Sequence, residues 1–147
     1  MQPVFSAEMR HLEEQCGIAS SELMENAGGA VFRAALRLAE SAGLTRFAIL
    51  AGKGTNGGDA FVCARLLQEN GCQVDLFLTV QPEQLQGEAM AAFQRLPQCL
   101  RQTLRQQLTA DDLDWNTLVI DGLLGTGVKG IPREPIASWI ELVNASG

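Results

Sequence analysis

Two glycine-rich stretches hold the polar residues that could bind a ligand. The first, G-K-G-T-N-G-G-D at residues 52–59, follows an apolar run at residues 47–51 and leads into a helical pattern. Four glycines in eight positions leave a backbone that can take positive φ and let a ligand press against it. A loop that leaves a strand and opens a helix also presents backbone N–H groups to anions. We therefore predict a binding site in this loop.

The second stretch follows Asp121, which ends the apolar run at residues 118–120 and precedes the loop at residues 122–130. In a parallel sheet, ligands bind beyond the carboxyl ends of the strands, and both loops leave such ends. We therefore expect Asn56 and Asp121 to approach each other although they lie far apart in the sequence.

The elements that must position these loops alternate between strand and helix. The pattern predicts strands at residues 45–51, 73–80 and 118–120. It predicts helices at 6–15, 20–42, 58–70, from Pro82 through Leu96, and at 135–143, with one or two more turns within 100–108. This order indicates an α/β fold with a parallel sheet covered on both faces.

Three glycines mark packing or boundaries in the predicted helices. Gly43 and Gly71 should end the helices that precede them. Gly28, which lies with a second glycine inside the long helix, costs about 1 kcal/mol against alanine. Close packing against a neighbouring element explains it better than the approach of a ligand.

Composition limits the class of protein. The chain has 147 residues, enough for one domain, with 46% hydrophobic residues and a net charge of −6. Such an acidic chain argues against nucleic acid or anionic lipid as a general partner. Cys16, Cys63, Cys72 and Cys99 form no C-x-x-C pair, and His11 is the single histidine, so no zinc pattern exists. With no signal peptide or membrane span, we expect free thiols and a cytoplasmic location.

Common nucleotide motifs fit the first loop poorly. G-x-G-x-x-G at residues 52–57 matches the dinucleotide fingerprint, but the acid that should end the second strand is missing, since Asp75 lies at its start. An NAD-dependent oxidoreductase is therefore a weak alternative. The triphosphatase loop fails because Gly54 follows Lys53 and Phe47 stands where a glycine is needed.

Three motifs together resemble one family. Residues 52–59 with Ala64-Arg65 resemble the G-x-G-N-N-G-G-D-G…A-R motif of the YjeF N-terminal family, the NAD(P)H-hydrate epimerases. Residues 120–127 resemble its second motif, D-x-L-x-G-T-G, and residues 23–28 its L-M-E-x-A-G signature. The motifs occur in the family's order, and the resemblance runs from about residue 9 to the end.

The resemblance implies a Rossmann-like three-layer α/β/α sandwich with a mainly parallel sheet. It implies epimerisation at C6 of hydrated NADH and NADPH, a repair of damaged cofactors, with a potassium ion bound by Asn56 and Asp121. It further implies a homodimer and, in many bacteria, fusion to an ADP-dependent dehydratase. The substrate-binding residues that it implies are Thr55, Asn56, Gly57, Gly58, Asp59, Gly125, Thr126, Gly127, Val128, Lys129, Gly130 and Ile131.

The sequence departs from the family pattern in three places. Thr55 replaces the first asparagine of N-N and loses its amide donors, and Ala60 replaces a glycine. The family's V-D-x-P-S-G segment, with its candidate general base, is due after residue 147. We therefore expect residues 1–147 to be a single incomplete, C-terminally truncated domain, in which no catalytic residue is identified. The alternative is a non-catalytic nucleotide-binding or protein-interaction module of the same fold.

Each candidate also has a structural explanation. Asp59 could cap a helix, Asn56 could tolerate a left-handed backbone in an exposed loop, and Asp121 could shape a turn. Lys129 and Arg133 could contact a phosphate or simply be solvated. The two tryptophans, at 115 and 139, are expected to pack in the core.

Overall fold

The computed structural model describes residues 20–123 and 134–146, so the expected helix at 6–15 lies outside the described residues. Strands and helices alternate along the chain, as the sequence predicts. Short 3₁₀ turns at Pro82–Gln84 and Ala110–Asp112 lie between them. The elements are α2 Ser20–Ala42, β1 Arg46–Ala51, α3 Thr55–Glu69, β2 Gln73–Leu78, α4 Gly87–Gln94, α5 Gln98–Thr103, β3 Thr117–Gly122 and α6 Ile136–Ser146.

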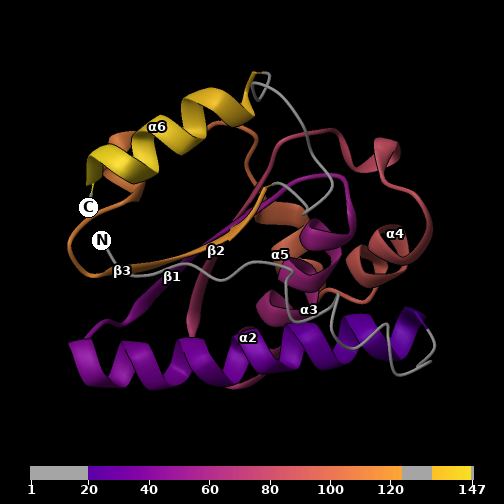
Figure 1. Ribbon diagram of the computed structural model, residues 1–147, viewed down its shortest axis with the longest axis horizontal. Coiled ribbons are helices and arrows are strands. Elements are labelled where there is room, and N and C mark those ends of the chain that lie inside the picture. The colour runs from indigo at the N-terminus through magenta and orange to yellow at the C-terminus, as the bar shows by residue number, and fades with distance from the viewer. Residues whose placement is uncertain (1–19, 124–133, 147) are drawn as a thin grey trace.

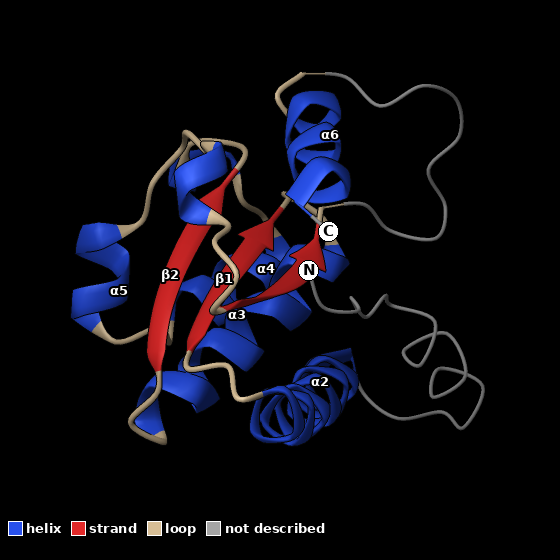
Figure 2. Ribbon diagram, turned by 90° about the vertical axis from the view of Figure 1, so that its left-hand side faces the viewer, coloured by secondary structure: helices blue, strands red, loops and turns tan. Residues whose placement is uncertain are grey.

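The described strands form one parallel sheet in the order β2-β1-β3. Central β1 pairs with both neighbours, and Ile49 lies opposite Leu76 on one side and Ile120 on the other. The strands point the same way (Figure 2), so their carboxyl ends share one edge. The predicted parallel sheet is confirmed.

Helices cover both faces of this sheet (Figure 1), which confirms the three-layer α/β/α architecture. Phe47 and Ile49 of β1 belong to the core on the α2 and α3 side. The alternate residues Ala48 and Leu50 belong to the core beneath α6, where Trp139 packs edge-to-face on a phenylalanine of β2. Because β1 is buried on both faces, it reads as a continuous apolar run.

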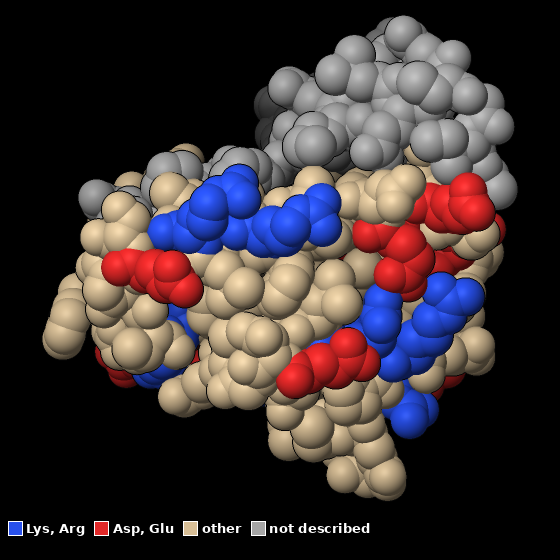
Figure 3. Space-filling model, turned by 90° about the horizontal axis from the view of Figure 1, so that it is seen from below, with Lys and Arg blue, Asp and Glu red and all other residues tan. Residues whose placement is uncertain are grey.

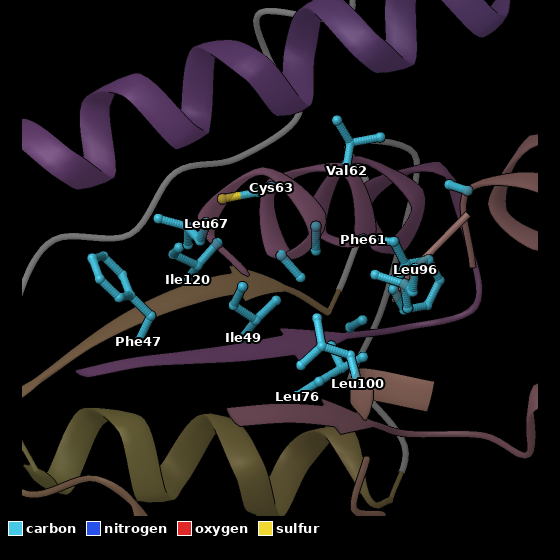
Figure 4. Packing of buried hydrophobic residues seen from close by; sticks show 14 of the residues in the cluster. Phe47, Ile49, Phe61, Val62, Cys63, Leu67, Leu76, Leu96, Leu100 and Ile120 are labelled. Carbon is cyan, nitrogen blue, oxygen red and sulfur yellow. The ribbon is translucent and has the colours of Figure 1, made fainter. Parts of the chain in front are cut away.

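The larger core lies between the sheet and α3 (Figure 4). Phe47, Ile49 and Ile120 of the strands face Leu67 and Cys63 of the helix. Cys63 packs in the core as a small hydrophobe, and burial raises the pKa of its thiol. Cys63, Cys72 and Cys99 are all free thiols.

Helix ends agree with the sequence where glycine sets them. Gly43 and Gly71 have φ of 71° and 82°, and each follows the last turn of a helix as predicted.

The helix predicted from Pro82 through Leu96 is wrong in its first part. Pro82 opens only a 3₁₀ turn, which a reciprocal pair of Gln81 and Gln84 side-chain bonds closes. Leu85 is then extended and buried, and α4 begins at Gly87.

Proline also marks the start of the next helix. Pro97 lies directly before α5, where a fixed φ and a missing N–H cost nothing. The turns predicted within residues 100–108 correspond to α5, which ends earlier. Arg105 is extended and exchanges backbone hydrogen bonds with Leu76 and Leu78 at the edge of β2.

The surface carries charges of both signs. The face on which α2 lies shows Lys and Arg side chains interspersed with Asp and Glu (Figure 3). The described residues of this face therefore form no extended patch of a single sign. Of the helices in residues 20–123 and 134–146, none combines the length and apolarity needed to cross a bilayer.

Candidate functional site

The first glycine-rich stretch is mostly helix rather than loop. α3 begins at Thr55, so only residues 52–54 connect it to β1. The expected positive φ is wrong for all four glycines, because the described glycines with positive φ are Gly43, Gly71 and Gly87. The glycines of this stretch need another explanation.

Close packing explains why three of these four positions are glycine. A Cβ added to Gly57 would lie 1.9 Å from the carbonyl oxygen of Gly52, and one on Gly58 would lie 2.4 Å from Cε of Met24. By contrast, a Cβ on Gly54 would meet nothing within 4 Å. The first turn of α3 therefore folds tightly onto the end of β1, and Gly54 borders open space.

The carboxyl ends of β1 and β3 contact each other next to the first turn of α3. The Gly52 N–H donates to the Gly122 carbonyl oxygen at 2.9 Å, and a Cβ on Gly52 would lie 2.4 Å from the Leu123 oxygen. A Cβ on Gly122 would lie 2.9 Å from the Asn56 backbone oxygen. These contacts need glycine at both position 52 and position 122.

Asn56 and Asp121 line the same small cavity, as the sequence predicts. It measures about 20 Å³, enough for a single water-sized species. Three polar side chains meet apolar groups from α2, α3 and β3 in its wall. The described lining residues are Val31, Asn56, Asp59, Ala60, Ile120, Asp121 and Gly122.

The structure corrects two expectations about these polar residues. Asn56 is only 7% exposed and its backbone is not left-handed, so it is neither in an exposed loop nor a left-handed turn residue. Asp59 does not cap α3, because Gly54 occupies the capping position and Asp59 lies in the second turn. Asn56 and Asp59 are three positions apart on one helix, and therefore share the face that meets the end of β3.

Asp121 shapes the turn after β3 and also lines the cavity. Its Oδ1 accepts the Leu123 N–H at 2.9 Å, which confirms the turn role. Burial raises the pKa of its carboxyl, and the hydrogen bond from Leu123 opposes this shift. A half-buried carboxylate next to a cavity favours a cation there, because a positive charge offsets the cost of partly removing the carboxylate from water.

The donor set fits a hard cation. Amide and carboxylate oxygens suit such ions, whereas thiolates and imidazoles select transition metals. Within the described ranges, no three His, Cys, Asp or Glu residues gather as a metal cluster. Asn56 and Asp121 are residues of this cavity whose oxygens could hold such an ion.

Several predicted site residues have no described geometry. The side chain of Thr55 and all of residues 124–133, which include the second substrate-binding set Gly125, Thr126, Gly127, Val128, Lys129, Gly130 and Ile131, lie outside what the structure describes. Arg133 lies there as well.

Asp75 has a structural role far from the cavity. It is the third residue of β2 and pairs with Arg46 at 2.9 Å. It lies toward the amino ends of the strands and not at the edge where a ribose-binding acid would act. The fingerprint of an ordinary NAD-dependent oxidoreductase is therefore incomplete in space as well as in sequence.

The contribution of α2 to the cavity is not predicted from the sequence. Val31 lines the cavity, and Met24 packs on the first turn of α3. The available signal was Gly28, one turn before Val31, which lets the two helices touch. Glu25 is held in ion pairs with Arg65 at 2.6 Å and Arg95 at 3.3 Å, so it ties α2 to α3 and α4.

Comparison with known proteins agrees with these features. Residues 20–147 match the family described as YjeF-related protein N-terminus. The chain is 39% identical over 126 residues to the NAD(P)H-hydrate epimerase of Rhodopirellula baltica, covering 84% of this chain and 50% of that protein. It is 36% identical over 137 residues to the bifunctional NAD(P)H-hydrate repair enzyme Nnr of Hyperthermus butylicus, covering 90% of this chain and 25% of that protein.

A solved structure shares the fold. The crystal structure of yeast ynu0 superposes with a TM-score of 0.65 at 24% identity, covering 99% of this chain and 66% of that one. The chain thus spans between a quarter and a half of the length of the two curated relatives described above.

Proposed function

Because the chain belongs to the family of YjeF-related protein N-termini, we propose that it carries the site of an NAD(P)H-hydrate epimerase. Such an enzyme interconverts the two C6 epimers of hydrated NADH or NADPH and so repairs damaged cofactor. The names of the relatives from Rhodopirellula baltica and Hyperthermus butylicus support this activity.

One observation about the site carries the proposal: the amide of Asn56 and the carboxylate of Asp121 line one cavity at the carboxyl ends of β1 and β3. This is the edge at which open parallel sheets bind nucleotides. The arrangement brings two separate family motifs to a single place, as one substrate site requires.

The start of α3 is suited to the phosphates of the dinucleotide. No side chain caps this helix, and its dipole favours a negative charge at its first turn. Gly54 borders open space, so a phosphate can approach the backbone there. Residues 55–59, at the start of α3, would contact the substrate, and residues 125–131 would supply the second set of contacts.

A potassium ion would be held by Asn56 and Asp121. When bound, it would offset the negative charge of Asp121 and of the nearby phosphates. The protein's own contribution is to keep the two oxygen donors at fixed positions, since both lie in tightly packed backbone.

Further properties extend the proposal beyond the site. The name of the bifunctional relative supports the proposal that the chain works beside a second repair activity. The family resemblance identifies this second activity as an ADP-dependent dehydratase. The homodimer is proposed on that resemblance alone, and the cytoplasmic location on the cysteine pattern of the sequence.

The test is epimerisation of hydrated NADPH by the purified chain and, side by side, by a longer version that includes the V-D-x-P-S-G segment. One pure epimer is mixed with protein in potassium buffer, and the ratio of the two epimers is followed by chromatography. With the longer version we expect faster exchange than without protein, and at least a roughly tenfold loss in Asp121→Asn, as for other residues that hold a metal site together. Asp75→Asn is the matched control, because it removes a carboxylate at the opposite end of the sheet.

Two results would contradict the proposal. Exchange at the spontaneous rate, with saturable binding of hydrated NADPH, would identify a non-catalytic binding module. Exchange at the spontaneous rate without such binding would rule out a substrate site in this chain altogether.

A further inference from the structure

Among the described residues that line the cavity beside Asp121, Val31 lies outside the family motifs. Val31 belongs to α2, which contributes no cation ligand, yet its side chain lines the same space as Asn56 and Asp121. We propose that Val31 sets the upper size limit of the cation that this cavity accepts. This inference rests on the cation site of the proposed function and concerns its selectivity.

The volume of the cavity leaves little room to spare. At about 20 Å³ it exceeds only slightly the roughly 10–15 Å³ that one water needs. An ion of about the size of a water molecule fits, and a much larger one must push a wall aside. Among the described residues, the apolar part of that wall consists of Val31, Ala60 and Ile120.

Two of these apolar residues cannot move away from the cavity. Ile120 is 3% exposed within β3, and Ala60 is 3% exposed on α3. The Cβ of Ala60 lies 2.8 Å from where a Cβ on Gly122 would be, so helix and strand already touch at the glycine backbone. Moving either residue would disturb the sheet itself.

The position of Val31 is fixed by the close approach of α2 to α3. A Cβ on Gly28 would lie 2.4 Å from Cβ of Val62 and 2.8 Å from the Asp59 carbonyl oxygen. Val31 follows Gly28 by one turn and so lies on the same face of α2. Interiors packed in this way resist expansion. A larger cation would have to displace the half-buried side chain of Val31 from this position, which gives the site a steric selectivity independent of its oxygen donors.

Val31→Ala should relax this limit. Thermal unfolding is measured in a series of Na⁺, K⁺, Rb⁺ and Cs⁺ chlorides, with tetramethylammonium chloride as the reference at equal ionic strength. In the wild type, we expect K⁺ to raise the Tm more than Cs⁺ does. In Val31→Ala, the ratio of the half-saturating concentrations of Cs⁺ and K⁺ should fall about tenfold, the scale of discrimination that one methylene gives in a pocket.

Two further variants separate selectivity from stability. Val31→Ile should shift the preference toward Na⁺, the opposite direction. Val74→Ala removes the same atoms from another half-buried valine of the same core, one that does not line the cavity, and should keep the wild-type order of ions. Because each ratio is taken within one variant, a general loss of stability cancels.

The outcomes distinguish this inference from the function it rests on. If K⁺ stabilises the wild type and both Val31 variants keep the wild-type ratios, Val31 does not limit ion size, while the cation site stands. If no alkali cation raises the wild-type Tm above the reference salt, the cation site itself is refuted, and the inference with it.

Discussion

Asp121 shows how one side chain can serve both structure and ligand. Its Oδ1 accepts the Leu123 N–H and fixes the turn, while its carboxyl group lines the cavity with Asn56. Replacement by asparagine keeps an oxygen that can accept the same hydrogen bond, but it removes the charge. The two roles can therefore be separated by one substitution.

We predict that Asp121→Asn abolishes the stabilisation by potassium and leaves the fold intact. The Tm of the wild type should rise with KCl above that in tetramethylammonium chloride, and the Tm of the variant should not. A loss of native structure in the variant would instead mean that Asp121 acts mainly by stabilising the turn after β3. The same potassium response in both proteins would exclude Asp121 as a ligand.

The raised pKa of Asp121 predicts a pH dependence of stability. Burial is the larger cause, and it favours the protonated form in the folded protein. Such a group stabilises the fold below its ordinary pKa of 3.8, and that contribution is lost as the pH rises through the folded pKa.

The test compares the free energies of unfolding of wild type and Asp121→Asn without alkali cations, from about pH 4 to pH 7. The wild type should lose stability relative to the variant as the pH rises, and KCl should reduce this loss. A difference that stays constant with pH would mean that the carboxyl has the same pKa in the folded and unfolded protein.

At the scale of elements, the contact between α2 and α3 positions the site. Gly28 lies against Val62 and against the carbonyl oxygen of Asp59, a residue of the cavity. Gly29, its neighbour, faces away, since a Cβ there would meet only Nη1 of Arg33 at 3.4 Å. The two adjacent glycines thus have different physical reasons to be glycine.

We predict opposite effects of alanine at these two positions. Gly28→Ala should cost about 1–3 kcal/mol through overpacking, despite its better helix propensity. Gly29→Ala should be neutral or gain up to about 1 kcal/mol, because it meets only the flexible end of a side chain. Urea denaturation measures both. Equal effects at the two positions would contradict the close contact of α2 with α3.

At the scale of the whole molecule, the two tryptophans show whether α6 covers the sheet as the third layer of the fold. Trp139 of α6 is 3% exposed against the sheet, whereas Trp115 is 87% exposed before β3. The expectation that both pack in the core is therefore correct for Trp139 and wrong for Trp115. Trp115 lies in a polar segment, and the sequence there does not indicate whether its side chain is exposed.

We predict separate fluorescence behaviour for the two residues. Trp115→Phe leaves Trp139, whose emission should be blue-shifted and protected from acrylamide. Trp139→Phe leaves an exposed ring that acrylamide quenches freely. If the emission of Trp139 in the first variant is quenched as in urea-unfolded protein, α6 does not cover the sheet in solution.

Much of the fold and part of the site follow from local patterns. The three strands and the ends of α2 and α3 appear where apolar runs and glycines place them. The meeting of Asn56 with Asp121 also follows, because parallel strands bring their carboxyl ends to one edge. The early start of α3 does not follow, since four glycines in eight residues favour a loop by propensity, and tertiary packing overrides it.

The sequence alone determined the class of fold and the approach of Asn56 to Asp121, because strand periodicity is a local signal and parallel strands bring their carboxyl ends to one edge. Only the tertiary structure decided that Asn56 and Asp59 are buried, that the glycines permit contact and not a left-handed backbone, and that Val31 completes the cavity. Those facts depend on how closely α2, α3 and β3 approach one another. That distance is set by packing between residues far apart in the chain, which no local pattern encodes.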